Sequence, residues 1–138
     1  MKNNKAKSFV VIMIVIALLV LFLRILVDKV INFTCIQNES IAQSTLKFIS
    51  VALENYAKDN RGSYPDKFSV LTQSHPAYLD KDYTRQLSQK GYSYNCSRLD
   101  ASGYSCYAFP VRCNLTGRIA FTVTTGSLLI SEECAKKE

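Results

Sequence analysis

Residues 9–27 read FVVIMIVIALLVLFLRILV, an apolar run of 19 residues that only Arg24 interrupts. As an α-helix rising 1.5 Å per residue, the run would be about 28 Å long, close to the ~30 Å hydrocarbon core of a bilayer. Arg24 lies within a turn of the far end, where its long side chain can reach the headgroups. The run therefore predicts a transmembrane helix.

The charges around this run predict its orientation. A basic leader, residues 1–8, carries three lysines and no acidic residue. From Asp28 onward there are 13 lysines and arginines against 11 acidic residues, so this part contributes only +2 to the total charge of +6. By the positive-inside rule, we expect a cytoplasmic N-terminus and an external C-terminal domain. Because the net charge of the external part is close to zero, the total charge of +6 gives little support for a nucleic-acid partner.

The residues after the run do not form an ordinary cleavage site. LFLRILVDKVINF, residues 21–33, has no small-x-small pair for signal peptidase. Cys35 follows Asn-Phe-Thr, which does not match the small apolar consensus before a lipoprotein cysteine. A plain signal anchor with no further role is one interpretation that these residues leave open.

The helix is expected to continue beyond the membrane, because no glycine or proline occurs before Gly62. The amphipathic half, residues 28–62, has apolar residues at spacings of three and four, which predict a stripe that packs on a domain. The stripe comprises Ala42, Leu46, Ile49, Leu53 and Tyr56, with Ala52 and Ala57 alongside. The solvent-exposed side of this helix is expected to carry Gln43, Lys47, Glu54 and Lys58.

Two features bear on the course of this helix. The segment INFTCIQN, residues 31–38, is its least helical part, so the helix could bend or fray there. The stop signal is DNRG at residues 59–62, because glycine readily takes the left-handed position that ends a helix.

Residues 63–90 contain two prolines and scattered aromatics, which predict a loop with a short helical turn around Lys67 to Gln73. This loop should cover the helix stripe. Residues 91–138 alternate in short segments between turn signals, which predicts an antiparallel meander of three or four strands. The face expected to pack on the helix comprises Tyr92, Tyr94, Tyr107, Phe109, Ile119, Phe121 and Val123 in part. The expected fold class is α+β, one long helix packed on a small sheet.

The chain has five cysteines, which predict disulfides in an external domain and one thiol left over. Cys96 and Cys106 flank SRLDASGYS and would face each other across a hairpin, so they are the first candidate pair. Cys113 and Cys134 bracket the last two strands and could join the C-terminal tail to the sheet. That pairing leaves Cys35 alone, although spacing does not decide the connectivity.

The sequence offers no constellation for catalysis, a metal or a cofactor. The cysteine spacings contain no close pair of the kind that zinc sites use, and His75 is expected to be an exposed loop residue. No phosphate-binding loop, paired carboxylates or nucleophile-base motif occurs. We therefore expect a protein that is not an enzyme.

The whole pattern resembles the type IV pilin-like proteins, and most closely the major pseudopilins of type II secretion systems. The resemblance rests on the basic leader, Phe9 opening an apolar helix, ISVALENYAKDNRGSYP at residues 49–65, PAYLD at residues 76–80, and the closing meander. It implies a pilin-like fold, an inner-membrane anchor, processing by prepilin peptidase and assembly with other pilin-like subunits through the helix. The four candidate disulfide cysteines also fit a disulfide-bearing branch of such proteins.

Two positions depart from the family pattern. Ser8 stands where the family has glycine before the cleaved bond, which would lie between Ser8 and Phe9. Met13 stands where the family has a glutamate that pairs with the N-terminal amine of a neighbouring subunit. The sequence therefore leaves two hypotheses: a pseudopilin or minor pilin that assembles through its helix, and an uncleaved, non-polymerising binding module anchored in the envelope.

Overall fold

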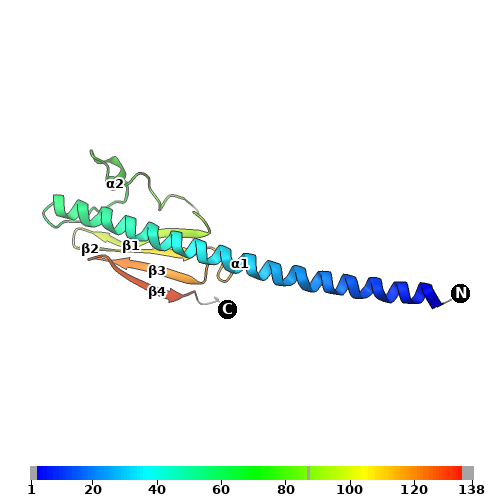
Figure 1. Ribbon diagram of the computed structural model, residues 1–138. Coiled ribbons are helices and arrows are strands. Elements are labelled where there is room, and N and C mark those ends of the chain that lie inside the picture. Colours follow the sequence, from blue (N-terminus) through cyan, green and yellow to red (C-terminus); the bar gives the residue numbers. More distant parts are fainter. Residues whose placement is uncertain (1–2, 87, 135–138) are drawn as a thin grey trace. The chain divides into compact units, whose positions relative to one another are not determined.

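A computed structural model of the chain describes residues 3–86 and 88–134. Its elements are α1 (Asn3–Asp59), α2 (Ser69–Gln73), β1 (Tyr92–Asp100), β2 (Gly103–Pro110), β3 (Ile119–Thr124) and β4 (Leu128–Glu133) (Figure 1). The predicted α+β class is confirmed, because the second half of the long N-terminal helix packs on a four-stranded antiparallel sheet. Residues 1–2 of the predicted leader, Leu87 of the predicted loop and residues 135–138 of the predicted meander lie outside the described residues.

The chain divides into two compact units, Met1–Phe33 and Thr34–Glu138. The first unit holds the early turns of α1, including the whole apolar run. The second unit holds the remaining turns of α1, α2 and the sheet. Residues 31–38 are helical throughout, so the helix does not break at the segment that the sequence marks as its weakest.

α1 ends at Asp59, at the predicted stop signal. The amide of Gly62 donates a hydrogen bond to the carbonyl of Ala57 at 2.7 Å, which closes the last turn. Arg61 and Gly62 both have positive φ values, 56° and 85°. This left-handed pair reverses the chain, and glycine adopts such a conformation without steric cost.

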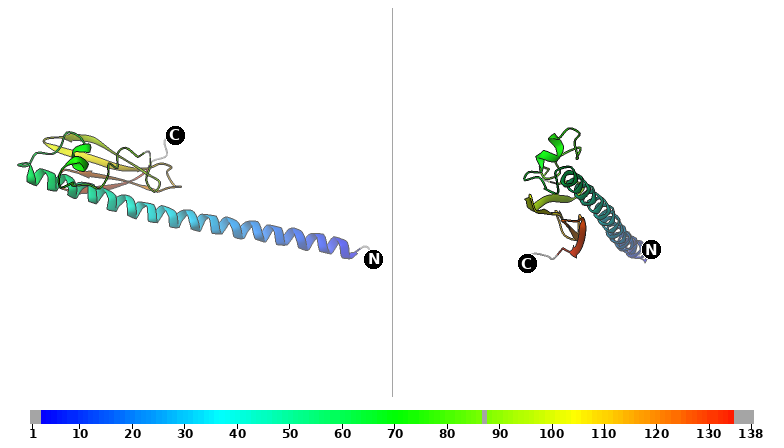
Figure 2. Two further views of the ribbon diagram at one scale, coloured as in Figure 1. Left: turned by 90° about the horizontal axis from the view of Figure 1, so that it is seen from above. Right: turned by 90° about the vertical axis from the view of Figure 1, so that its left-hand side faces the viewer.

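The core of the second unit forms around the predicted stripe of α1. Ala42, Leu46, Ile49 and Leu53 are at most 1% exposed, and Ala52 and Ala57 are also buried. The loop after α1 covers this stripe with residues that join the same cluster: Phe68, Leu71, Leu79 and Tyr83. The stripe and the covering loop are therefore as the sequence predicts. Figure 2 shows the ribbon of α2 and its loop beside the last turns of α1.

The sheet is a meander in the order β1-β2-β3-β4, with every neighbouring pair antiparallel. One cross-strand row aligns Tyr94, Ala108, Phe121 and Ser131, and the next aligns Cys96, Cys106, Val123 and Leu129. β1 is interrupted by a bulge between Cys96 and Arg98. Most of the first row lies on the face packed against α1, which gives the core its second layer.

The prediction for β2 is wrong in its choice of face. Its buried side chains are Tyr104, Cys106, Ala108 and Pro110, whereas Tyr107 is half-buried and Phe109 is exposed on the opposite face. Both phases of the β2 alternation contain apolar residues, so periodicity alone does not select one. Ala108 lies between Tyr94 and Phe121 in its row, and a small residue fits between two aromatic neighbours beneath the helix.

Candidate assembly and anchoring surfaces

The apolar run in the first unit leaves all its side chains exposed. From Phe9 to Val27, the large hydrophobic side chains are between 42% and 63% exposed. α1 is long and apolar enough to cross a membrane, and the most apolar window has no residue buried in the protein. An apolar helix without a covering partner needs lipid or another protein around it. Together with the two disulfides described below, this supports a membrane-anchored domain on the extracytoplasmic side.

The predicted processing and assembly residues all lie in this exposed part of α1. The bond between Ser8 and Phe9 falls inside the helix, whose described residues begin at Asn3. Phe9 and Met13 are four residues apart, so both side chains lie on one side of the helix, and both are exposed. Met13 therefore presents an apolar side chain where the resemblance implies a carboxylate.

In the second unit, α1 has an apolar face directed away from its core stripe. It comprises Ile36, Ser40, Ser44, Phe48 and Val51, which recur every three or four residues, and we refer to it as the outer face. Ile36, Phe48 and Val51 are exposed large hydrophobic residues. The Ser44 hydroxyl donates to the carbonyl of Ser40 at 2.8 Å, which satisfies that polar group within the helix. Lys47 is exposed and lies beside this row, three residues after Ser44 and four before Val51. The outer face is therefore a narrow apolar row bordered by a lysine, and it could contact another helix along that row.

Glu54, which the sequence places on the wet side of α1, is instead half-buried at a junction of three segments. Its Oε2 accepts a hydrogen bond from the Tyr64 hydroxyl at 3.0 Å. Its Oε1 accepts one from the Tyr104 hydroxyl at 2.9 Å and one from the Gly126 amide at 2.8 Å. The carboxylate thus fixes α1 to the loop after it, to β2 and to the β3–β4 turn. Its position on the helix borders the core stripe, and only folding brings the three donors to it.

A second junction joins α1 to the segment between β2 and β3. Asn38 Nδ2 donates to the carbonyl of Thr116 at 2.9 Å, and the amide of Arg118 donates to Glu39 Oε1 at 2.7 Å. Gly117 lies between these contacts, and a Cβ there would lie against the ring of Tyr92. Sequence periodicity does not identify Asn38 and Glu39, because their partners are backbone groups nearly eighty residues away.

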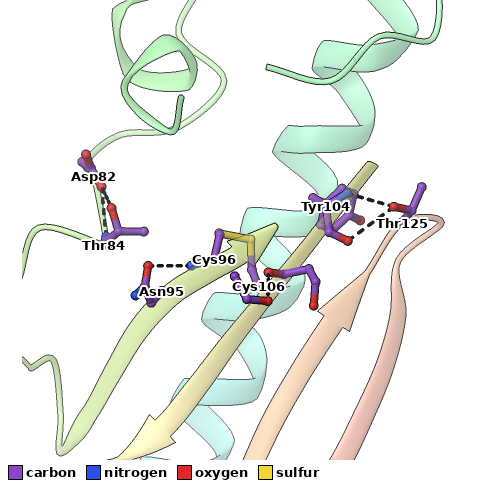
Figure 3. The surroundings of a disulfide bond; sticks show 9 residues. Asp82, Thr84, Asn95, Cys96, Tyr104, Cys106 and Thr125 are labelled. Atoms are coloured by element: carbon purple, nitrogen blue, oxygen red, sulfur yellow. Dashed lines mark hydrogen bonds between the residues drawn. A yellow bond between two sulfur atoms is a disulfide. The ribbon is translucent and has the colours of Figure 1, made fainter. Parts of the chain in front are cut away.

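Two disulfides stabilise the sheet and its tail, in the pairs favoured by the sequence. Cys96 and Cys106 are direct partners in the β1–β2 register (Figure 3). Close by on β2, the Tyr104 amide donates to Thr125 Oγ1 at 2.9 Å, which ties β2 to the β3–β4 turn. Cys113 is bonded to Cys134 and so joins the loop before β3 to the residue after β4. Cys35 is the remaining cysteine and is buried without a disulfide.

Several tyrosines of the core have pKa values above that of a free tyrosine. Burial raises the pKa of Tyr104 to about 12, and the hydrogen bond to Glu54 acts in the same direction. Burial and the Asp80 carboxylate raise the pKa of Tyr83 to about 12. Burial also raises the pKa of Tyr92, and Glu39 adds to that effect. Tyr92, Tyr94 and Tyr104 of the β1–β2 hairpin are at most 4% exposed, so they are core residues and do not form an open binding face, whereas Tyr107 is half-buried.

These raised pKa values predict an alkaline loss of stability. An unfolded tyrosine ionises near pH 10, whereas Tyr83 and Tyr104 keep their protons to about pH 12 in the folded protein. Their contribution is therefore complete below pH ~10 and is lost as the pH rises to ~12, by about 2 kcal/mol for each residue. Denaturant unfolding across this range, followed by tyrosine fluorescence, measures the loss.

Tyr104→Phe serves as the control, because it removes one of the late-titrating groups. The variant should show a smaller decline in unfolding free energy between pH 10 and 12 than the unmodified protein. Ionisation of every tyrosine near pH 10 in the folded protein, followed by phenolate absorbance, would contradict the assignment of Tyr83 and Tyr104 as protected groups.

The architecture is pilin-like: an apolar N-terminal helix whose second half packs on a four-stranded antiparallel sheet. The chain matches no protein-family model and no curated protein sequence.

Proposed function

We propose that this protein is a non-enzymatic pilin-like subunit, a pseudopilin or minor pilin, of a type II secretion or type IV pilus system. Its apolar run holds it in the inner membrane, with the N-terminus cytoplasmic and the second unit in the periplasm or outside the cell. Prepilin peptidase is the expected processing enzyme, acting between Ser8 and Phe9. Other pilin-like subunits are the expected partners, through α1.

The outer face of α1 is the observation that carries this proposal. A helix that only anchored a domain would need an apolar surface in the lipid and a core stripe beneath the sheet. This helix also exposes Ile36, Phe48 and Val51 in the part that holds the domain core. Apolar residues aligned along an exposed helix face favour packing against another helix. A subunit that assembles through α1 would bury this face together with the apolar run.

Ser8 and Met13 favour the second hypothesis, an uncleaved, non-polymerising anchored binding module. Ser8 is larger than the glycine that the family has before the cleaved bond. Met13 has no charge to pair with the N-terminal amine of a neighbour. A subunit at the end of a filament would not need that pairing on both sides, so Met13 is compatible with a minor or tip subunit.

Crosslinking of the full-length protein in its native membranes tests assembly through the outer face. Phe48→Asp and Phe109→Asp form a matched pair, because the two side chains are similarly exposed on different surfaces. Phe48 is 48% exposed on the outer face of α1, and Phe109 is 45% exposed on the side of the sheet directed away from α1. The unmodified protein and Phe109→Asp should give crosslinked oligomers. Phe48→Asp should lose most of them, since a buried charge is costly in an apolar interface.

Mass spectrometry of the same membranes separates the two hypotheses. A subunit beginning at Phe9, and especially one with a methylated amine, supports a processed pilin-like subunit. An intact Met1 together with an absence of crosslinked oligomers in the unmodified protein supports the anchored module instead. Oligomers that survive Phe48→Asp but not Phe109→Asp would place assembly on the sheet and contradict the role of the outer face.

A further inference from the structure

The segment from Val111 to Arg118 forms a tight loop at one end of the second unit. The amides of Leu115 and Thr116 donate to the carbonyl of Arg112 at 3.1 and 2.9 Å, and the Cys113–Cys134 disulfide braces the loop from the C-terminal side. The contacts of Asn38 and Glu39 with Thr116 and Arg118 fix it to α1. Asn38 and Glu39 lie near the start of the second unit, which begins at Thr34.

Lys90 belongs to the same surface. The amide of Val111 donates to the carbonyl of Gly91 at 2.9 Å, which places the neighbouring Lys90 beside the start of the loop. A Cβ on Gly91 would lie 3.1 Å from Asn38 Nδ2 and 2.8 Å from the Thr116 Cβ, so this chain segment is close to both α1 and the loop. Lys90 and residues 111–118 are named the basic loop from here on.

The basic loop combines free cations with exposed apolar side chains. Lys90, Arg112 and Arg118 are exposed, and neither ion pair in the described part of the chain includes them. Val111 and Leu115 are exposed as well. Residues 111–118 contain no acidic residue. Among the described residues, the nearby carboxylates include Glu39, which accepts the Arg118 amide, and Glu133, the β4 partner of Ile119.

A short stretch of chain tethers the basic loop to the predicted membrane helix. Asn38 follows Val27, the last residue of the apolar run, by eleven residues, and all of them are helical. Eleven residues span at most about 40 Å even when fully extended, so the covalent connection limits how far Asn38 can lie from the end of that run. Headgroups extend roughly 5 to 8 Å from the hydrocarbon, and charges interact over a further ~8 Å at physiological salt. The short connection therefore confines the arginine side chains of the loop to a volume that includes the headgroups.

We propose that the basic loop binds the anionic phospholipid headgroups of the membrane in which α1 is anchored, with Leu115 entering the interface. Unpaired lysine and arginine beside exposed apolar side chains are the combination that anionic membrane surfaces bind. Because α1 connects the loop covalently to the membrane, the local concentration of lipid around the loop is high. Individually weak contacts between the loop and the headgroups can therefore give binding. This inference rests on the anchoring part of the proposed function and does not depend on filament assembly.

Tryptophan fluorescence of the full-length protein tests the proposal, because the chain has no tryptophan of its own. Leu115→Trp places a single reporter on the loop, and Lys58→Trp places a matched reporter on an exposed position of α1, twenty residues beyond Asn38. Both variants are reconstituted in vesicles of phosphatidylcholine alone and of equal parts phosphatidylcholine and phosphatidylglycerol. In the anionic vesicles, the tryptophan emission of Leu115→Trp should shift to shorter wavelength and be quenched by brominated lipid. The emission of Lys58→Trp should keep the wavelength of tryptophan in water.

Charge variants test the electrostatic part of the proposal. Adding Lys90→Gln, Arg112→Gln and Arg118→Gln to Leu115→Trp should lower loop binding in the anionic vesicles by about a hundredfold, since each cation near such a surface contributes about fivefold. The matched set Lys47→Gln, Lys58→Gln and Lys67→Gln removes the same charge from exposed positions elsewhere in the second unit and should leave the signal unchanged.

Four results would overturn the inference. Leu115→Trp could remain as water-exposed as Lys58→Trp in anionic vesicles that resist carbonate extraction, which would leave anchoring intact and reject loop binding. Its shift could appear in detergent and rise with protein concentration, which would identify a second copy as the occupant. A short DNA duplex could produce the shift without vesicles. Extraction of the protein by carbonate would reject the anchoring itself, and the inference with it.

Discussion

Glu54→Ala is expected to lower the free energy of unfolding by about 3 kcal/mol. The substitution removes three hydrogen bonds to a carboxylate, at 2.8 to 3.0 Å, from donors on three different segments. Hydrogen bonds to charged groups contribute about 1.5 to 3 kcal/mol each when they are well formed, although such contributions do not add fully. The Tyr104 side chain is only 1% exposed, so its hydroxyl would lose its acceptor inside the protein.

Two variants give this prediction its controls. Glu54→Gln keeps one acceptor oxygen and should cost about 1 kcal/mol. Asn55→Ala changes the exposed neighbour of Glu54 and should stay within about 0.5 kcal/mol of the unmodified protein. Urea unfolding of the full-length protein in detergent, followed by tyrosine fluorescence, ranks the three. Equal stabilities for Glu54→Ala and Asn55→Ala would show that the junction does not hold the segments together.

Leu46→Ala is expected to cost about 3 kcal/mol, through a different mechanism. Leu46 is fully buried in the stripe of α1, among residues of the sheet and the covering loop. Removing a buried leucine side chain loses its transfer free energy and leaves a cavity, at a cost of about 2 to 5 kcal/mol. Alanine is also the best helix former, so the loss comes from packing and not from the helix backbone.

Val51→Ala is the matched test of the opposite face of the same helix. Val51 is 53% exposed on the outer face, and its truncation should change the unfolding free energy of the isolated subunit by no more than about 0.5 kcal/mol. Thermal unfolding monitored by near-ultraviolet circular dichroism compares the two variants. Similar losses for Leu46→Ala and Val51→Ala would mean that α1 packs on the sheet with a different face.

The helix and its stripe could be predicted because both depend on local periodicity. Side chains three and four residues apart share a face of a helix, so the spacing of Ala42, Leu46, Ile49 and Leu53 identifies the buried side without knowledge of what covers it. The Cys96–Cys106 pair follows similar logic, because these two cysteines lie symmetrically about a hairpin turn. In each case the deciding contacts join residues that are near in sequence or aligned by a simple repeat.

The faces of β2 and the role of Glu54 could not be predicted, because they depend on distant partners. β2 has apolar residues on both sides, and the position of Ala108 between Tyr94 and Phe121 decides which side packs beneath α1. Glu54 looks like an ordinary surface residue until the Tyr104 hydroxyl, fifty positions later, is brought to it. The spacing of apolar residues in a strand or a helix carries no information about contacts between residues that are distant in sequence.

The sequence by itself determined that the chain begins with a membrane-length apolar helix, that the helix continues into an amphipathic half, and that a short-stranded meander follows. Hydrophobic length and spacing are properties of the chain alone, so they could be read directly. Only the tertiary structure decided which polar residues of α1 became junctions and which basic residues form no ion pair within the described part of the chain. Hydrogen bonds and ion pairs form between specific atoms within about 3 to 4 Å, and only the folded chain fixes those distances.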